Sequence, residues 1–358
     1  MKNYTFDDIA ADLGALRGEK FFPQDFSDVP CREISSPEFL EPAPLVSVIM
    51  LAYDHEAYIA RAIESVVCQK TAYPFELLIG EDHSPDRTME IVLQYQRKYP
   101  KLIRVFSSEK NVGVSKNIWR LYRHCRGKYW AFCEGDDLWT DERKLDRQCR
   151  VLEEDPEVGL VFSDCASVNA DTGETVRGFD YSPFPSGKWG KNVFIDSYLN
   201  EKINVYTCSA MIRALGNALE GPSVFTYNVP MGDVQLWCTA AKDRGTYFFR
   251  EKFGQRNMHT ASLTATWNIF KASISGIFVK SYFIHDIYGM AVTMRCLAVK
   301  MSNLAGNIYS GRKRCSCPSE NVAAIIRFVR KYRLAITAKA RVKLFLLWLR
   351  GLFKGPEK

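Results

Sequence analysis

The sequence predicts an α/β fold: a Rossmann-like, mostly parallel sheet with helices on both faces. From residue 45 onward, apolar runs of strand length alternate with segments of helical periodicity. The first run, "LVSVIMLAY" at 45–53, is dominated by apolar and β-branched residues, the pattern of a strand covered on both faces. Strands that alternate with helices favour right-handed crossovers and therefore a parallel sheet.

The elements follow in order. Residues 1–44 are polar and contain prolines, so we expect an N-terminal arm that leads into an ordered domain from residue 45. Ile59, Ile63 and Val66 stand at helical spacing after the first strand. The predicted strands then lie at 75–80, 103–107, 128–133 and 158–164, and the predicted helices at 85–99, from about 115, 143–155 and 232–245.

Two regions depart from this alternation. Residues 165–228 are rich in Gly, Pro and aromatic residues, which indicates loops that shape a substrate site. Residues 266–358 are expected to form a helical C-terminal region, with a packing helix at about 270–300 and a basic amphipathic tail.

Composition sets limits on the class of protein. The 358 residues, 47% of them hydrophobic, are enough for one large domain or one domain with an appendage. No apolar stretch approaches the roughly 20 residues of a membrane span, and the first residues lack the features of a signal peptide, so we expect a cytoplasmic protein. Eleven cysteines, an odd number, indicate no disulfide framework. Cys315 and Cys317 are interpreted as a loop with free thiols in preference to half of a metal site.

The excess of basic over acidic residues is confined to the C-terminal tail. Residues 312–358 hold 13 Lys and Arg against 2 Glu, whereas the remainder holds 35 basic against 39 acidic residues. Basic residues mixed with Trp348, Leu349 and Phe353 are typical of a helix that lies on an anionic membrane surface. The alternative is a helix that packs on the domain with its basic residues in solvent. No recognition motif accompanies the charge, so we expect no nucleic-acid partner.

Three acidic loops follow predicted strands. They are Asp54 after the first strand, "EDHSPD" at 81–86 and "EGDD" at 134–137. Parallel sheets bind ligands at the carboxyl ends of their strands, so these loops are expected at one edge. "EGDD" suits Mg²⁺ or Mn²⁺ with a diphosphate. The alternative for both longer motifs is ordinary turn and helix-cap chemistry.

Five motifs together carry a resemblance. The region of about 45–265 resembles glycosyltransferase family 2, whose GT-A-fold enzymes use nucleotide-diphospho-sugars. The motifs stand in the family's order: "VSVIMLAYDHEAYIARAIESVVCQKTAYPFELLIGEDHSPDRT", "NVGVSKN", "KYWAFCEGDDLWTDERKLDRQ", "MGDVQLW" and "RNMHTASLTA".

The resemblance implies roles for individual residues. Nucleotide-sugar binding falls to the ends of the first two strands and to parts of the later motifs: Ala52, Tyr53, Asp54, Glu81, Asp82, Glu134 and Arg256. Asp136 and Asp137 are assigned to the metal, with His259 completing its surroundings. Asp233 is the base that deprotonates the acceptor hydroxyl.

The sequence departs from the commonest family pattern at four positions. Asp54 stands where Asn is usual, Glu81 where Asp is usual, and His83 where Gly is usual. Glu134 replaces the first Asp of the metal motif, and its longer side chain makes Asp136 the stronger candidate ligand. No "QxxRW" element occurs, which favours addition of a single sugar.

The resemblance thus implies an inverting, metal-dependent transfer of one sugar to a glycan or lipid-linked acceptor. The setting would be polysaccharide or lipopolysaccharide synthesis at the inner face of the cytoplasmic membrane. Two alternatives are a sugar nucleotidyltransferase, for which the first strand lacks a Gly-rich triphosphate loop, and an inactive nucleotide-sugar-binding protein. The sequence does not encode the donor sugar or the linkage.

Overall fold

The structure is a computed structural model. It describes residues 5–21, 25–26, 28–199, 202–215, 232–260, 269–309 and 319–353. The chain divides into two compact units. The sheet unit comprises residues 24–226 and 236–260, and the helical unit comprises residues 1–23, 227–235 and 261–358. Each is described by itself. The boundaries drawn from the sequence at residues 45 and 265 remain predictions.

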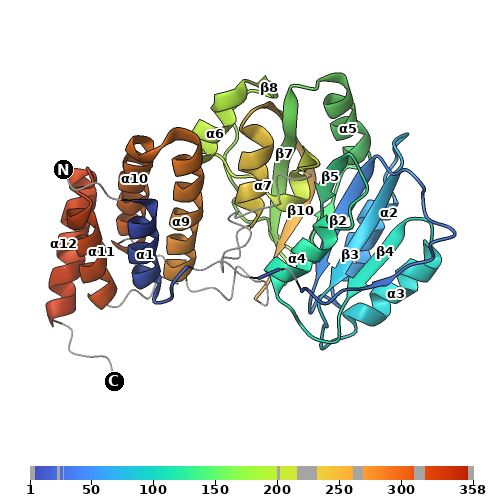
Figure 1. The fold of residues 1–358 in the computed structure, drawn as a ribbon, viewed down its shortest axis with the longest axis horizontal. Helices are drawn as coiled ribbons and strands as arrows, with labels where there is room; N and C mark the ends of the chain where they lie inside the picture. The colour runs from blue at the N-terminus through green and yellow to red at the C-terminus, as the bar shows by residue number, and fades with distance from the viewer. Residues whose placement is uncertain are drawn as a thin grey trace. The chain divides into compact units, whose positions relative to one another are not determined.

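The described strands of the sheet unit form one ten-stranded sheet (Figure 1). Its order is β1-β4-β3-β2-β5-β9-β7-β10-β6, and β8 pairs with β10. The strands are β1 (Arg32–Ile34), β2 (Val46–Ala52), β3 (Phe75–Glu81), β4 (Ile103–Ser107), β5 (Tyr129–Phe132), β6 (Leu138–Trp139), β7 (Val158–Asn169), β8 (Gly187–Trp189), β9 (Met211–Arg213) and β10 (Gly245–Met258).

The centre of this sheet is parallel, as expected. β4, β3, β2 and β5 are parallel neighbours, and β7 pairs in parallel with β10. β9 lies antiparallel between β5 and β7, and β1, β6 and β8 add further antiparallel pairs. The predicted α/β fold class is therefore confirmed, with antiparallel strands that the apolar runs alone did not reveal.

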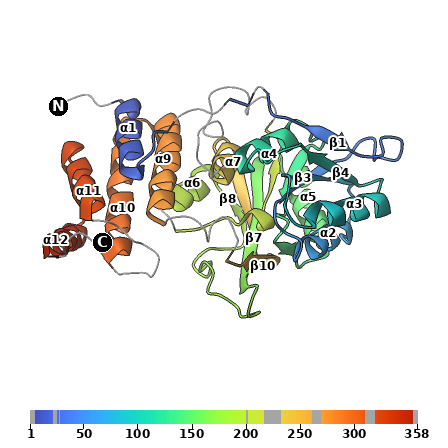
Figure 2. The same cartoon turned by 90° about the horizontal axis from the view of Figure 1, so that it is seen from below.

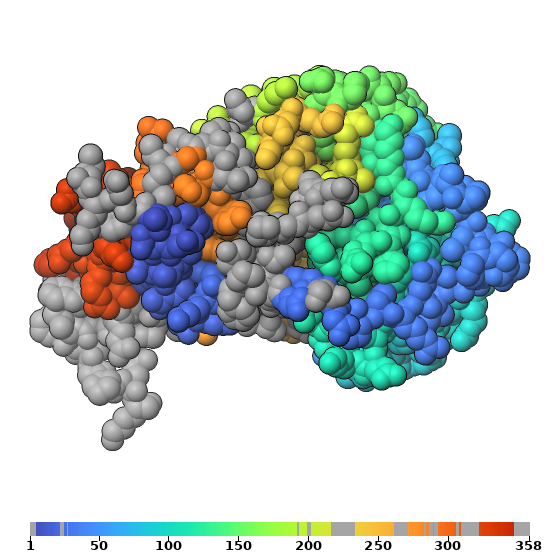
Figure 3. Space-filling model, in the orientation of Figure 1, coloured from blue at the N-terminus to red at the C-terminus, as the bar shows by residue number. Residues whose placement is uncertain are grey.

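Helices cover both faces of the parallel region (Figure 2). The side chains of Val46, Val48 and Met50 from β2 share a core with helices α2, α3 and α5, while α4 lies on the opposite face. These helices are α2 (Ile59–Val67), α3 (Thr88–Lys98), α4 (Val114–Tyr122) and α5 (Lys144–Glu154). In the space-filling view, helices and loops cover the strands on the visible face, among them the cyan-green segment that contains α4 (Figure 3). All four helices were predicted.

The segment at 165–228 contains more regular structure than expected. It includes the end of β7, then β8, helix α6 (Lys191–Leu199), the short 3₁₀ helix η1 (Thr207–Ser209) and β9. These elements are short, so they offer too few residues for a periodic pattern. Residues 200–201 and 216–228 of the predicted substrate segment lie outside the described residues. Helix α7 (Gly232–Ala241) confirms the predicted helix and has residues in both units.

The helical unit contains α1 (Phe6–Arg17), α9 (Ile269–Tyr288), α10 (Met290–Tyr309), α11 (Ser319–Lys331) and α12 (Ala338–Phe353). Helix α1 was not expected in a polar arm. It starts at a capping box, since Thr5 Oγ1 accepts the Asp8 N–H and the Asp8 carboxylate accepts the Thr5 N–H. The ring of Phe21 stacks on Phe278, with centroids 3.9 Å apart. The predicted packing helix is two helices, separated at Gly289, whose φ is 75°.

Two expectations concern the whole chain. The described cysteines are free thiols, whereas Cys315 and Cys317 lie outside the described residues. In the described ranges no helix is both long and apolar enough to span a bilayer.

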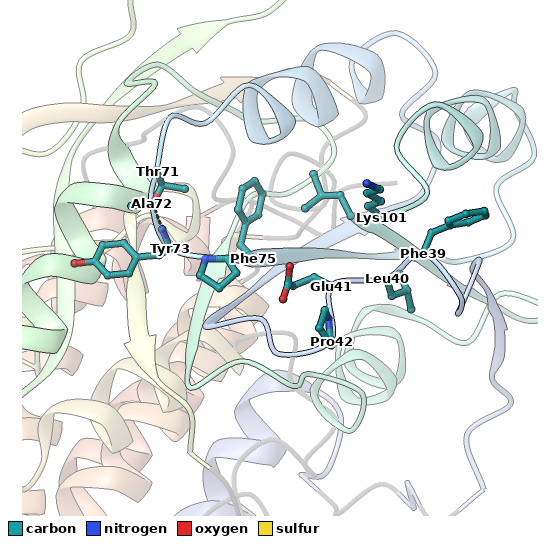
Figure 4. Close-up of a pocket in the computed structure, with 11 residues that line it drawn as sticks. Phe39, Leu40, Glu41, Pro42, Thr71, Ala72, Tyr73, Phe75 and Lys101 are labelled. Carbon is teal, nitrogen blue, oxygen red and sulfur yellow. Dashed lines mark hydrogen bonds between the residues drawn. The ribbon is translucent and has the colours of Figure 1, made fainter.

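A hollow of about 520 Å³ lies at the amino ends of the central strands (Figure 4). Phe39, Tyr73 and Phe75 line it, with Glu41 and Lys101 nearby. Phe75 is the first residue of β3, so the hollow is at the edge opposite to the carboxyl ends of β2 and β3. Ligands of parallel sheets bind at the carboxyl ends, so we give this hollow no role in catalysis.

Candidate active site

Three acidic loops meet at the carboxyl edge of the parallel strands. β2 lies between β3 and β5, and Ala52 is the register partner of Glu81. The loop after β5 is held against β2 because the Gly135 N–H donates to the Leu51 carbonyl at 2.8 Å. The expected convergence of the "AYD", "EDHSPD" and "EGDD" segments is therefore what the structure shows.

The loop after β2 has a left-handed turn at its tip. Ala52 is buried, Tyr53 is exposed, and Asp54 has φ 58°. The Asp54 N–H donates to Ser84 Oγ at 3.2 Å, and the Glu56 N–H donates to Asp86 Oδ2 of the next loop at 2.8 Å. The loops after β2 and β3 therefore hold each other in place.

The loop after β3 is built around Glu81. Its buried carboxylate accepts hydrogen bonds from the N–H groups of His83 and Ser84 and from the Ser107 hydroxyl. His83 has φ 58°, in the left-handed region where Gly and Asn are favoured. The same is true of Asp54, which gives a physical reason for the Asn and Gly that are usual at these two positions.

Asp82 links this loop to the next helix. Its two carboxylate oxygens accept the N–H groups of Val112 and Gly113, each at 2.9 Å, just before α4 begins. Burial raises the pKa of Asp82 although these bonds and Arg120, 3.8 Å away, oppose the shift. The carboxylate fixes the "NVGVSKN" loop at the edge where the three acidic loops meet.

The acidic turn after β5 is anchored on both sides. Glu134 Oε2 accepts a hydrogen bond from the Thr207 hydroxyl at 2.7 Å. Trp139 donates its indole N–H to the Phe132 carbonyl at 3.0 Å, so the ring fixes the turn from behind. A Cβ at Gly135 would stand 2.7 Å from His55 Nδ1, so the turn and the first loop are in close contact.

Asp136 is the centre of a cluster with two histidines. His259 Nε2 lies 3.1 Å from Asp136 Oδ2, and His55 Nε2 lies 3.9 Å from the same oxygen. Tyr58 stacks on the His259 ring at a centroid distance of 4.7 Å. Burial raises the pKa of Asp136, but the His259 hydrogen bond and the charge of His55 outweigh it, so the pKa lies below its ordinary value. Its two histidine neighbours therefore favour the ionised form of Asp136.

His55 is a residue that the sequence interpretation missed. Its ring is largely buried, and burial lowers its pKa despite the opposing charge of Asp136. Within the described residues, its Nδ1 has no hydrogen-bond partner. The available signal was its place one residue after Asp54, at the tip of a strand.

Asp137 has a different environment from Asp136. It is buried, and its Oδ1 accepts the Asn257 N–H at 2.9 Å. Burial, together with the charges of Asp136 and Glu134, raises the pKa of Asp137 well above its usual value. Its observed contact therefore joins the turn to β10.

Two further predicted residues have surroundings of their own. The Arg256 guanidinium stands over the Tyr206 ring, 5.9 Å from its centroid. Asp233 belongs to the helical unit, so its place relative to the sheet unit is not described. Burial raises the pKa of Asp233, and Lys280 opposes that shift.

The cluster offers two side chains to a divalent cation. Asp136 and His259 are adjacent, and a carboxylate with an imidazole suits Mn²⁺. Among the described residues, no set of three or more His, Cys, Asp or Glu side chains forms a metal-holding group. Cations of this kind are commonly held by one or two carboxylates together with substrate phosphates, so the two residues fit a site that the substrate would complete.

Comparisons with known proteins concern the family and the fold of the chain. Residues 47–217 match the family described as "Glycosyl transferase family 2". An uncharacterised protein of Mycobacterium tuberculosis is 34% identical over 154 residues, which is 43% of each chain. The putative teichuronic acid biosynthesis glycosyltransferase TuaG of Bacillus subtilis is 34% identical over 111 residues, 31% of this chain and 43% of that protein. The matches thus span less than half the length of these curated relatives.

A solved structure supports the fold. The crystal structure of S. aureus TarS in complex with UDP-GlcNAc has a TM-score of 0.62, with 18% identity, and covers 85% of this chain and 89% of that one. At this identity the similarity shows the GT-A-like fold alone. The family match, the fold and the ordered motifs lead to one conclusion: the chain carries a glycosyltransferase family 2 domain, which spans residues 47–217.

Proposed function

We propose that this chain transfers a single sugar from a nucleotide-diphospho-sugar to a hydroxyl of a glycan or lipid-linked acceptor, with inversion at the anomeric carbon. The observation that carries the proposal is the convergence of the loops of Asp54, Asp82 and Asp136 at the carboxyl ends of β2, β3 and β5. The TarS structure contains UDP-GlcNAc, which supports a donor of this class. Relatives named for teichuronic and teichoic acid synthesis support a cell-surface polysaccharide as the setting.

In this proposal, the first two loops bind the nucleoside. Tyr53 is exposed beside them and has a ring available for the base. The Asp82 carboxylate is positioned by two backbone N–H groups, and each of its oxygens retains a lone pair for the base or ribose. Glu81 acts through the loop that it shapes, because its oxygens already accept three hydrogen bonds.

Asp136 and His259 would hold Mn²⁺ or Mg²⁺ against the diphosphate, and Glu134 and Arg256 are proposed to bind the donor. The bound cation would neutralise the departing nucleoside diphosphate. Asp137 is proposed to support this site through Asn257, as a buried partner of Asp136. His259 stays in place by stacking on Tyr58, and His55 adds positive charge beside Asp136 when it is protonated.

Asp233 is the proposed general base. A raised pKa brings a carboxylate closer to the value that suits proton abstraction near neutral pH, and burial shifts Asp233 in this direction. The carboxylate would take the proton of the acceptor hydroxyl as its oxygen attacks the anomeric carbon from the face opposite to the diphosphate.

The test is a panel of nucleotide sugars assayed with and without EDTA. Release of a nucleoside diphosphate that depends on acceptor and metal supports transfer, whereas release of pyrophosphate would indicate a nucleotidyltransferase. Binding without turnover would indicate an inactive module. Asp233→Asn should lower turnover by about 10²–10⁴-fold and leave donor affinity unchanged. Asp243→Asn, an exposed aspartate after the same helix, is the matched control.

We also propose that the protein works at the inner face of the cytoplasmic membrane. The support is the basic C-terminal region, which forms helices α11 and α12. The side chains of Trp348, Leu349 and Phe353, on which the sequence interpretation partly depended, lie outside those described. Removal of residues 320–358 should release the protein from membranes, and unchanged membrane association would refute this part of the proposal.

A further inference from the structure

Helices α11 and α12 of the helical unit lie side by side (Figure 1). Their side chains line a hollow of about 710 Å³. Its lining combines two kinds of side chain. The apolar part is formed by Ala323, Ile326, Val329, Leu334, Ile336, Leu344 and Phe345, and four arginines complete it: Arg327, Arg330, Arg333 and Arg341.

Helix α11 has one apolar stripe that is only partly covered. Val322, Ile325, Ile326 and Val329 stand at i, i+3, i+4 and i+7, so they share one face of the helix. Val322 and Ile325 are buried in the helical unit, as is Phe328. Ile326 and Val329 are only partly buried and line the hollow, so this part of the stripe is available to a ligand.

Helix α12 continues this apolar surface. Val342 and Phe345 are 57% and 54% exposed, and Leu346 beside them is also exposed. The three stand at i, i+3 and i+4, so they share one side of the helix. Phe345 also lines the hollow, which joins the hollow to an exposed apolar strip.

The segment that carries the four arginines contains few acidic residues. Glu320 stands in the first turn of α11, and the next acidic residue is Glu357. Lys331, which does not line the hollow, pairs with Asp12 at 2.6 Å, whereas no ion pair joins the four arginines to any described carboxylate. Arginine presents a planar set of donors that matches a phosphate in a bidentate manner. Among the described residues the cluster therefore offers guanidinium groups outside any ion pair, of the kind that binds phosphate.

Arg333 occupies a position where glycine is usual. It follows the end of α11 with φ 50°, and the Leu334 N–H donates to the Val329 carbonyl at 3.0 Å, as in a glycine-terminated helix end. A side chain in this conformation costs about 1–2 kcal/mol relative to glycine. The residue at this position is nevertheless an arginine, and its side chain lines the hollow.

We propose that this hollow binds one anionic phospholipid. The arginines hold its phosphate, and one acyl chain lies on the apolar lining and the exposed strip of α12. The positive charge of the arginines favours an anionic lipid over a neutral one. The apolar lining favours a lipid with an acyl chain over free phosphate, which has no apolar part to contact it. The inference rests on the membrane contact proposed above and goes beyond it by assigning a lipid class and a site.

The test uses the full chain and vesicles of phosphatidylcholine alone or mixed in equal parts with phosphatidylglycerol. Arg330→Gln/Arg341→Gln removes two charges from the hollow, and Lys339→Gln/Lys343→Gln removes two from the same region outside its lining. In both double variants, the affinity for anionic vesicles should fall by about fivefold per charge removed, because the general electrostatic attraction to the membrane surface is weaker. The arginine pair should lose at least tenfold more, because it also loses hydrogen bonds to a charged group. Equal losses in the two pairs would refute the site.

Arg333→Gly separates lipid binding from folding. It should raise the thermal midpoint because it relieves the left-handed conformation, and it should still weaken binding to anionic vesicles about tenfold. A more stable variant with unchanged vesicle binding would refute a role for Arg333.

Calorimetry with soluble short-chain phosphatidylglycerol and with glycerol phosphate identifies the source of the phosphate. We expect the lipid to bind at least tenfold more tightly, and equal affinities would refute the role of the apolar lining. Nucleotide-sugar binding, measured in parallel, reports on the sheet unit. If vesicle binding persists in all the variants, the membrane contact stands and the specific site fails.

Discussion

Lys144 provides a prediction of how stability depends on pH. It begins helix α5, directly behind the acidic turn, and its side chain is completely buried. Its Nζ donates to Gln148 Oε1 at 2.7 Å and stands 4.2 Å from the centroid of the Trp139 ring. Burial lowers the pKa of this ammonium from 10.5 to about 8. The perturbation that tests this is Lys144→Met, which keeps the length of the side chain and removes the charge.

The size of the effect follows from the shift in pKa. Between about pH 8 and 10.5 the unfolded chain binds a proton at Lys144 that the folded chain has lost, so stability rises with pH in this window. The full shift corresponds to about 3 kcal/mol. Below pH 8 both states are protonated, and the folded protein carries the whole cost of the buried charge.

The assay is urea unfolding of both proteins from pH 7 to 11, followed by tryptophan fluorescence. The difference between the two free energies of unfolding removes the contributions of other titrating groups. It should move by about 3 kcal/mol in favour of the wild type as the pH rises. Met cannot donate to Gln148, which costs about 1–3 kcal/mol at every pH and therefore leaves the slope unchanged.

Two results would refute this reasoning. One is a difference that stays constant over the whole range, which would mean that Lys144 is solvated in the folded protein. The other is a movement in the opposite direction. The exposed Lys242 provides the control, since Lys242→Met should give a flat difference.

Three further predictions concern the site and its support. His83→Gly should raise the free energy of unfolding by about 1 kcal/mol, because it relieves a φ of 58°; thermal unfolding tests this, and a loss of stability would contradict it. Gly135→Ala places a Cβ 2.7 Å from His55 Nδ1 and should lower turnover about hundredfold by displacing the acidic turn; wild-type kinetics would show that the turn adapts. Glu76→Ala leaves the nearly buried Arg104 without its closest buried partner and should cost about 3–5 kcal/mol in urea unfolding; a cost under about 1 kcal/mol would mean that Glu33 compensates.

Long elements with a clear period were predictable. β4 lies at the predicted residues, and β2 and β3 differ from their predicted ranges by one or two residues. A buried strand must be apolar over its whole length, so its sequence reveals it. The three residues of β9 carry no such pattern, yet β9 separates β5 from β7 in the sheet. Its position depends on pairing with strands far away in the chain.

The acidic residues of the site were also predictable, but their individual environments were not. Asp136 and Asp137 are adjacent residues of the same type. The fold directs Asp136 to His259 and Asp137 to the backbone of Asn257, 120 residues later, and this difference moves their pKa values in opposite directions. Only contacts between remote segments distinguish the two carboxylates: Asp136 meets His55 and His259, and Asp137 meets β10.

The sequence by itself determined the α/β class, the central strands and the order of the family motifs, because these depend on local periodicity and on residue type. Tertiary structure alone decided that His55 joins the cluster of Asp136 and His259, and that four arginines of the tail surround an apolar hollow. The physical reason is the same in both cases. Side chains from remote segments come close to one another, and become buried so that their pKa values shift, only when those segments pack together.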